Sequence, residues 1–111
     1  MDKVSLKTAI KLYYIYDKPC EWHYEQGQLV SGEFCSYNKQ GLEIDEYDAP
    51  FLVDVQSWLN KEHNIQVVVN DDFQGFFFSC KNLATGVEYI TSHRYVSYER
   101  ALARAIDYAL T

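Results

Sequence analysis

The sequence predicts an α+β fold in which a three-stranded antiparallel sheet is flanked by two helices, in the order α-β-β-β-α, over residues 48–111. Apolar residues recur at helical spacing in residues 48–63 and 98–110, and they alternate in three short stretches in between. Residues 1–47 are predicted to form an N-terminal extension of helix, turns and short strands that packs on the sheet. At 111 residues the chain is expected to be a single domain.

The first helix of this unit is predicted over residues 48–63. Asp48 suits the N-cap, and Pro50 is tolerated in the first turn, where its missing N–H costs nothing. Asn64 can adopt the left-handed conformation that ends a helix. The apolar stripe of this helix consists of Phe51, Leu52, Val55, Trp58 and Leu59.

The three strands are predicted over residues 65–69, 76–81 and 87–96. Residues 70–72 with Gly75 supply one hairpin turn, and residues 82–86 supply a second. The last helix, over residues 98–110, begins after Ser97 as N-cap. Its predicted buried face consists of Ala101, Leu102, Ala105, Ile106 and Ala109.

Both faces of the predicted sheet carry apolar residues. Val68 points away from Val67 and Val69, and Phe77 points away from Phe76 and Phe78. A sheet with helices on one side is normally polar on the other. The second face therefore needs a cover, for which residues 1–47 are the first candidate and a subunit interface is the second.

Residues 1–47 are less regular. Ser5 can cap a short helix whose apolar face includes Leu6, Ala9, Ile10 and Tyr13. From residue 20 to residue 42, glycines separate short segments, which indicates turns with one or two short strands.

The charge distribution disfavours a nucleic-acid backbone as partner but leaves it open. The net charge is −6 and the sequence pI is about 4.9. Residues 1–54 hold ten carboxylates against five lysines, and a cluster of four lies at Glu43, Asp45, Glu46 and Asp48. Binding to phosphates needs a surplus of Lys and Arg on one surface, and the sequence has no basic run.

The location expected from the sequence is the cytoplasm. The three cysteines, Cys20, Cys35 and Cys80, are odd in number and irregularly spaced, which is typical of reduced thiols. No charged-then-apolar leader and no apolar run of membrane-spanning length is present, so we expect no membrane association.

The order of elements in residues 48–111 resembles the double-stranded-RNA-binding domain, a likeness of topology that extends to an alanine-rich last helix opened by a serine. The resemblance implies a phosphate grip of the form Lys-Lys-x-Ala-Lys at the start of that helix. The matching residues 98–102 are Tyr-Glu-Arg-Ala-Leu, which keep the alanine and no lysine. The histidine-bearing loop of the family corresponds to residues 71–75, which are acidic and lack histidine. The chain also looks like small bacterial or phage proteins, which implies no function.

No catalytic residue, metal ligand or cofactor site is predicted. Cys20 and His23 have the spacing of half a zinc site and Cys35 adds a third donor, but no second tight pair completes it. A Cys-His nucleophile at the same place lacks any sign of an activated thiol. The acidic turn at Asp71 and Asp72 lacks the twelve-residue ligand pattern of a calcium loop.

The candidate binding surface is aromatic with one cation. Arg94 is the best handle for an anionic ligand, with Phe77 as its neighbour, although an edge-strand charge that discourages pairing is the favoured alternative. Tyrosine and tryptophan are hot-spot residues in protein interfaces. The tyrosines considered for this surface are Tyr13, Tyr14, Tyr16, Tyr24, Tyr37 and Tyr47.

The function expected from the sequence is a small non-catalytic interaction module that binds a protein partner or a second copy of itself. The alternative is a nucleic-acid-related role, either through a patch of Arg94, Arg100 and Arg104 or as an acidic mimic of nucleic acid. A small hydrolase or transferase with a cleft at His23 or His93 ranks last.

Overall fold

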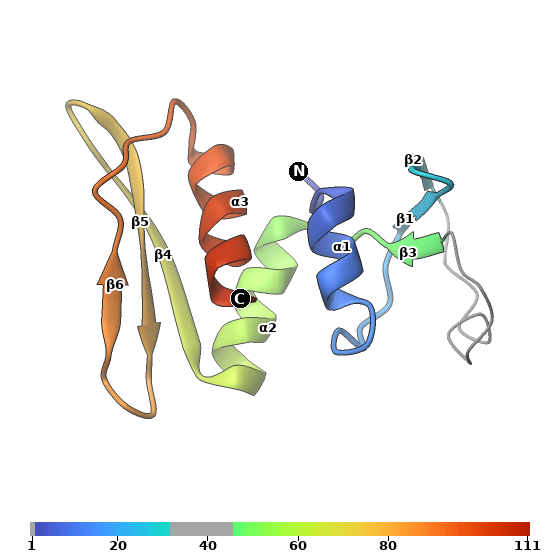
Figure 1. Ribbon diagram of the computed structural model, residues 1–111, viewed down its shortest axis with the longest axis horizontal. Coiled ribbons are helices and arrows are strands. Elements are labelled where there is room, and N and C mark those ends of the chain that lie inside the picture. Colours follow the sequence, from blue (N-terminus) through green and yellow to red (C-terminus); the bar gives the residue numbers. More distant parts are fainter. Residues whose placement is uncertain (1, 32–45) are drawn as a thin grey trace. The chain divides into compact units, whose positions relative to one another are not determined.

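The computed structural model describes residues 2–31 and 46–111, and these form two compact units (Figure 1). The first unit spans residues 3–51, and the second spans residues 52–111 together with Asp2. The predicted α+β class is confirmed. The prediction of one sheet is wrong, because the described residues form two three-stranded antiparallel sheets, one in each unit. That the chain is a single domain, and that residues 1–47 pack on the predicted sheet, stay predictions.

The first unit contains one helix and three short strands. They are α1 (Leu6–Leu12), β1 (Trp22–Glu25), β2 (Gln28–Ser31) and β3 (Glu46–Asp48), with β1 at the centre of the sheet. The expected cap is present, since Ser5 Oγ accepts a hydrogen bond of 3.3 Å from the Thr8 amide. Gln26 and Gly27 both have positive φ, which is the conformation that a two-residue hairpin turn between β1 and β2 requires.

The strand β3 explains why the first predicted helix starts too early. Asp48 pairs with His23 in the β1–β3 ladder, and the Ala49 amide donates to the Trp22 carbonyl at 2.9 Å. Asp48 is therefore a strand residue and not an N-cap, and the helix begins at Leu52, after Pro50. An aspartate two residues before a proline fits either role, and the sequence of 48–63 holds no signal of the partner strand.

The second unit follows the predicted order helix, three strands, helix. Its elements are α2 (Leu52–His63), β4 (Ile65–Asp72), β5 (Gly75–Asn82), β6 (Glu88–Ile90) and α3 (Tyr98–Ala109), and the strand order is β4-β5-β6. Asn64, with φ of 55°, ends α2 as predicted. The first turn is shorter than predicted. β4 continues to Asp72, so that only Phe73 and Gln74 separate it from β5.

Both helices of this unit cover the same face of its sheet (Figure 1). Val67, Phe78 and Cys80 point to this face and are buried, and Phe76 reaches the ring of Tyr98 on α3. The alternate residues, including Val68 and Phe77, point to the opposite face. Within residues 52–111 no helix or strand lies on that face, which we call the open face.

The third strand is interrupted by a bulge. Ser79 pairs with Ile90, so an unbroken ladder would place His93 opposite Phe76. Phe76 pairs instead with Tyr95, through hydrogen bonds of 2.7 and 3.0 Å, which leaves two extra residues between the two pairs. The Thr91 hydroxyl accepts the His93 amide at 3.1 Å and holds the chain out of the ladder. The strand predicted over residues 87–96 is for this reason only Glu88–Ile90.

The helix α3 supplies four buried side chains to the core of the second unit, as many as α2 does. Ser97 Oγ accepts the Arg100 amide at 3.2 Å, which confirms the predicted cap. The buried stripe consists of Ala101, Leu102, Ala105 and Ile106, as predicted, whereas Ala109 is half-buried. Alanine at two of these positions lets the helix axis approach β4 and β5 closely.

Replacing Ile106 with alanine is expected to destabilise the second unit by about 2–5 kcal/mol, because the side chain is fully buried and its removal leaves a cavity. Urea unfolding followed by the NMR signals of residues 52–111 measures the change. Val96→Ala is the matched control, since Val96 is exposed and should change the free energy of unfolding by less than about 0.5 kcal/mol. Equal effects of the two substitutions would show that α3 does not hold this core.

Candidate functional site

Arg94 and Phe77 come together on the open face. The guanidinium carbon of Arg94 lies 4.3 Å from the centre of the Phe77 ring, which is a cation–π stack. Phe77 is in the middle of β5, and the bulge brings Arg94 opposite it, because Tyr95 pairs with Phe76. The alternation of side chains along the predicted strands placed Phe77 and Arg94 on one face of the sheet. The sequence holds no signal of the bulge that sets their register.

Asp72 holds the Arg94 side chain in place. Arg94 Nε and Nη2 both lie 2.9 Å from Asp72 Oδ2, and Arg94 Nη1 donates to the carbonyls of Ser92 and His93 at 3.3 and 3.5 Å. The hydrogen bond from Arg94 lowers the pKa of the Asp72 carboxyl below its usual value. The Asp72 carboxylate thus offsets the charge of the guanidinium and orients it over Phe77. Arg94 is therefore not an unpaired cation on this face.

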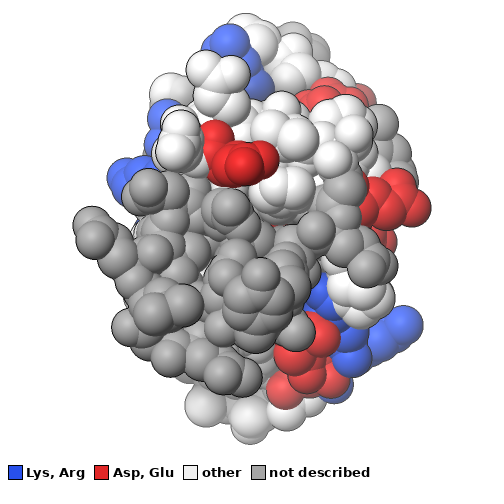
Figure 2. All heavy atoms as spheres, turned by 90° about the vertical axis from the view of Figure 1, so that its right-hand side faces the viewer, with Lys and Arg blue, Asp and Glu red and all other residues white. Residues whose placement is uncertain are grey.

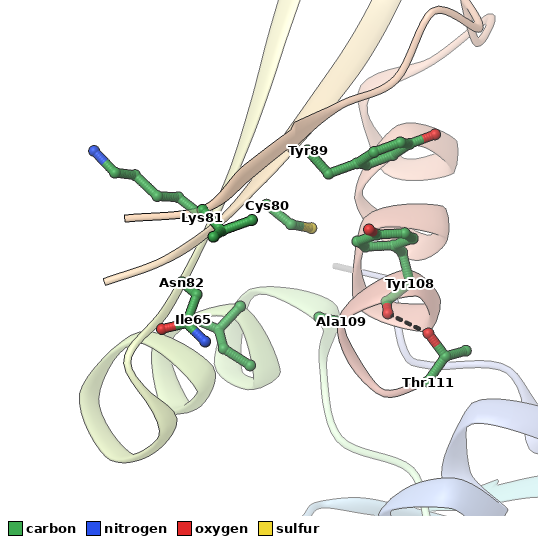
Figure 3. Close-up of a pocket in the computed structure, with 9 residues that line it drawn as sticks. Ile65, Cys80, Lys81, Asn82, Tyr89, Tyr108, Ala109 and Thr111 are labelled. Carbon is green, nitrogen blue, oxygen red and sulfur yellow. Dashed lines mark hydrogen bonds between the residues drawn. The ribbon is translucent and has the colours of Figure 1, made fainter. Parts of the chain in front are cut away.

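The rest of the open face is apolar at its centre and charged at both ends. Val68, Ser79 and Ile90 lie at one level of the three strands, and Ile90 exposes 57% of its surface. At the far end Lys81 pairs with Glu88 across β5 and β6, which places opposite charges directly opposite each other. Figure 3 shows the Lys81 side chain pointing away from Tyr89 and Tyr108, toward the open face.

The outer edge of β4 is partly closed by a side chain from α2. Gln56 Nε2 donates to the Val67 carbonyl at 2.7 Å. Phe76 and Phe78 form their backbone hydrogen bonds with the β6 side, so the residues opposite them on β4 direct their own backbone groups outward. By the same alternation Val67, which lies opposite Cys80, directs its carbonyl outward, and the bond from Gln56 makes this carbonyl unavailable to an added strand.

A cavity of about 280 Å³ lies at the end of the second unit where the strands meet the last turn of α3 (Figure 3). The Tyr89 and Tyr108 rings stack beside it with 4.4 Å between their centres, and Cys80 also lines it. The Cys80 thiol donates to the Ala105 carbonyl at 3.5 Å, and burial raises its pKa to about 11. A thiol with this pKa is almost entirely protonated at neutral pH, which makes it a poor nucleophile.

The predicted tyrosines are divided between core and surface. Tyr13 and Tyr16 are buried, and Tyr13 packs edge-on against Tyr47 at 5.3 Å. Tyr24 donates its hydroxyl to the Val4 carbonyl at 2.7 Å, and burial raises its pKa. Tyr14 is 85% exposed, and Tyr37 lies outside the described residues. A binding surface that includes all of these tyrosines stays a prediction.

The described residues provide no metal centre. Within residues 2–31 and 46–111, no group of three or more His, Cys, Asp and Glu side chains is close enough to hold an ion. His23 is buried with its Nε2 at 3.6 Å from Glu25 Oε2, and Cys20 donates to the Lys18 carbonyl at 3.5 Å. Cys35, the predicted third donor, lies outside the described residues.

Figure 2 shows both acidic and basic side chains among the described residues of one face. Arg94 lies on the open face, whereas Arg100 and Arg104 belong to α3, which covers the other face, so the three arginines do not form one surface. Glu43 and Asp45 of the acidic cluster lie outside the described residues. No described helix is long and apolar enough to cross a membrane.

Comparison of this chain with protein-family models, with curated proteins and with solved structures finds no match.

Removing the guanidinium is expected to raise the pKa of Asp72. In Arg94→Met the Asp72 carboxyl loses its hydrogen bonds from the guanidinium, so its pKa should rise toward the ordinary value. The side-chain carboxyl carbon signal in NMR measures this pKa.

The pKa of Asp72 is lower in the folded protein than in the unfolded chain, so the ion pair stabilises the fold at pH values above the unfolded pKa near 3.8. This contribution to the free energy of unfolding is lost as the pH falls through the folded pKa. Arg104→Met is the control, and an equal shift in it would refute a specific pair.

Cys80 is expected to react slowly with alkylating reagents. In a Cys20→Ser, Cys35→Ser background, the alkylation rate with iodoacetamide should rise about tenfold per pH unit from pH 7 to pH 10, because only the thiolate reacts and the pKa is about 11. Mass spectrometry measures the rate. A rate that levels off near pH 8 would mean that the thiol is not buried as described.

Proposed function

We propose that this protein is a non-catalytic interaction module that binds protein through the open face of the β4-β5-β6 sheet. The observation that carries the proposal is an apolar centre, made of Val68, Phe77 and Ile90, on a face that no element of residues 52–111 covers. Such a centre with charged residues around it is the usual composition of a protein interface.

The Arg94–Phe77 stack suits this role better than ligand binding. Arginine is enriched in interfaces because a planar guanidinium can stack and donate at the same time. Here its orientation is fixed in advance by Asp72, so that little side-chain freedom is lost on association. An anionic small molecule would have to displace the Asp72 carboxylate first.

A nucleic-acid-binding role has less support. Arg100 and Arg104 are exposed and one turn apart on α3, but Glu99 precedes them and the β4–β5 turn is acidic at Asp71 and Asp72. The chain offers no surplus of cations at either place. The topological likeness to the double-stranded-RNA-binding domain is not, by itself, support for its chemistry.

The proposal is tested by two substitutions at neighbouring positions on opposite faces. Ile90→Glu places a charge at the centre of the open face, whereas Val87→Glu places the same charge on a valine that is 69% exposed on the other side. In quantitative affinity capture from cell extract, Ile90→Glu should remove the proteins retained by the unmodified chain, and Val87→Glu should keep them. Both variants should unfold at nearly unchanged urea concentrations, because both side chains are mostly exposed.

Equal retention by all three chains would refute the open face as the interaction surface. Loss of retention in both variants would point to a general effect of the added charge instead.

A further inference from the structure

We infer that the outer edge of β6 binds an extended peptide segment of another protein, which adds to the sheet as a fourth, antiparallel strand. β6 is the outermost strand on the side away from β4 (Figure 1). The binding groups at this edge belong to the backbone of one strand, whereas the open face consists of side chains from all three. The edge is therefore a second surface, which can bind whether or not the open face does.

Every second residue of β6 directs its backbone hydrogen-bonding groups away from β5. The Thr91 amide donates to the Phe78 carbonyl at 3.0 Å, so these two residues form a bonded pair. Bonded and unbonded pairs alternate along an antiparallel ladder, so Tyr89 bonds to β5, whereas Glu88 and Ile90 point their N–H and C=O groups outward. Within residues 52–111 none of these four outward groups has a hydrogen-bond partner.

The two edges of the sheet are protected in different ways. At the edge of β4, the Gln56 side chain occupies the Val67 carbonyl. β6 is protected by its length instead, because it has three residues and the bulge at residues 91–94 ends its pairing. A segment of about five residues can add to such an edge, whereas the repeated pairing of long strands cannot.

The side chains of β6 determine what the added strand carries. Glu88 and Ile90 lie on the open face, and within residues 52–111 no ion pair engages the Glu88 carboxylate. A basic residue opposite Glu88 and an apolar residue opposite Ile90 form favourable cross-strand pairs. Tyr89 lies between them on the helix side, is 41% exposed and stacks on Tyr108, so it offers its ring to an aromatic residue opposite. In antiparallel pairing the segment therefore reads apolar, aromatic, basic from its N-terminal end.

A second copy of this chain fits the edge less well than such a segment. If all three residues of β6 pair about a twofold axis at Tyr89, each Glu88 lies opposite Ile90 of the second copy, and neither gains a favourable partner. The two chains also repel each other, because each carries a net charge of −6. The same charge attracts a segment with a basic residue. The chemistry of the edge thus favours a basic and aromatic segment of a different protein.

Titration of a synthetic peptide into the isotope-labelled full chain, followed by NMR, tests the inference. The probe is the acetylated and amidated peptide Thr-Val-Tyr-Lys-Thr, whose valine, tyrosine and lysine lie opposite Ile90, Tyr89 and Glu88. We expect a dissociation constant of roughly 0.1–1 mM, because few hydrogen bonds form, with the largest amide signal changes in residues 87–91.

Methylation of the peptide nitrogens tests the pairing without any change in the protein. The valine and lysine N–H groups of the peptide face β6 in the expected register, and its tyrosine N–H faces away. N-methylation of the valine and lysine together should weaken binding at least about tenfold, because both hydrogen bonds are lost. N-methylation of the tyrosine is the control and should change the dissociation constant less than about threefold.

Glu88→Pro is the matching change in the protein. Proline is tolerated at the first residue of a strand, and here it removes an outward N–H and sets its ring in the path of the added strand. Binding of the peptide should weaken at least about fivefold. Glu88→Gln keeps the N–H and loses only the charge, so it should weaken binding about two- to threefold.

The inference is overturned if about 5 mM peptide changes no amide signal, or if the changes lie outside residues 87–91. Binding that survives N-methylation of the valine and lysine would also contradict strand addition. Failure of the proposed function is a separate outcome. The peptide titration measures binding at the edge of β6, whereas the proteins kept or lost by Ile90→Glu in affinity capture measure binding at the open face.

Discussion

The packing of α3 against β4 and β5 is the contact on which the second unit depends. The four side chains that make it, Ala101, Leu102, Ala105 and Ile106, are all buried. Two alanines bring the helix close to the sheet, and the two larger residues fill the space on either side. Because α2 joins α3 on this face, the apolar side chains directed to the other face receive no cover from the unit itself. The open face is thus a consequence of the way the core is built.

The bulge between Ile90 and Tyr95 determines what the open face presents. Without the two extra residues Arg94 would lie opposite Gly75, two positions along β5 from Phe77. With them, Arg94 stacks on the ring and meets Asp72, which comes from the far strand of the sheet. The ion pair therefore spans the sheet from its β6 side to β4. A bulge that redirects one side chain in this way is a recurrent device near binding surfaces.

The strongly periodic parts of the chain could be predicted from the sequence, and the parts that depend on distant partners could not. The apolar faces of α2 and α3, the Ser5 and Ser97 caps and the stop at Asn64 follow from local chemistry. The structure has them, except that Phe51 precedes α2 and Ala109 is only half-buried. The second sheet was missed because β3 is three residues long and exists through its pairing with β1. The bulge could not be predicted for a similar reason. Thr91 and Ser92 are ordinary strand residues by type, and only the pairing of Phe76 with Tyr95 shows that the ladder is interrupted. For the candidate site, alternation placed Phe77 and Arg94 on one face, but the role of Asp72 needed the structure, because turn residues show no preferred partner in the sequence.

The distribution of charge decides which kind of association this geometry favours. At long range two copies repel each other, because each carries a net charge of −6. At short range the open face carries as many carboxylates as cations, with Asp72 and Glu88 against Arg94 and Lys81. The outer edge of β4 offers a different route to association, but Gln56 occupies the Val67 carbonyl there and hinders the pairing of a further strand. A neutral face beside a partly occupied edge favours association through the open face over pairing at the edge of β4.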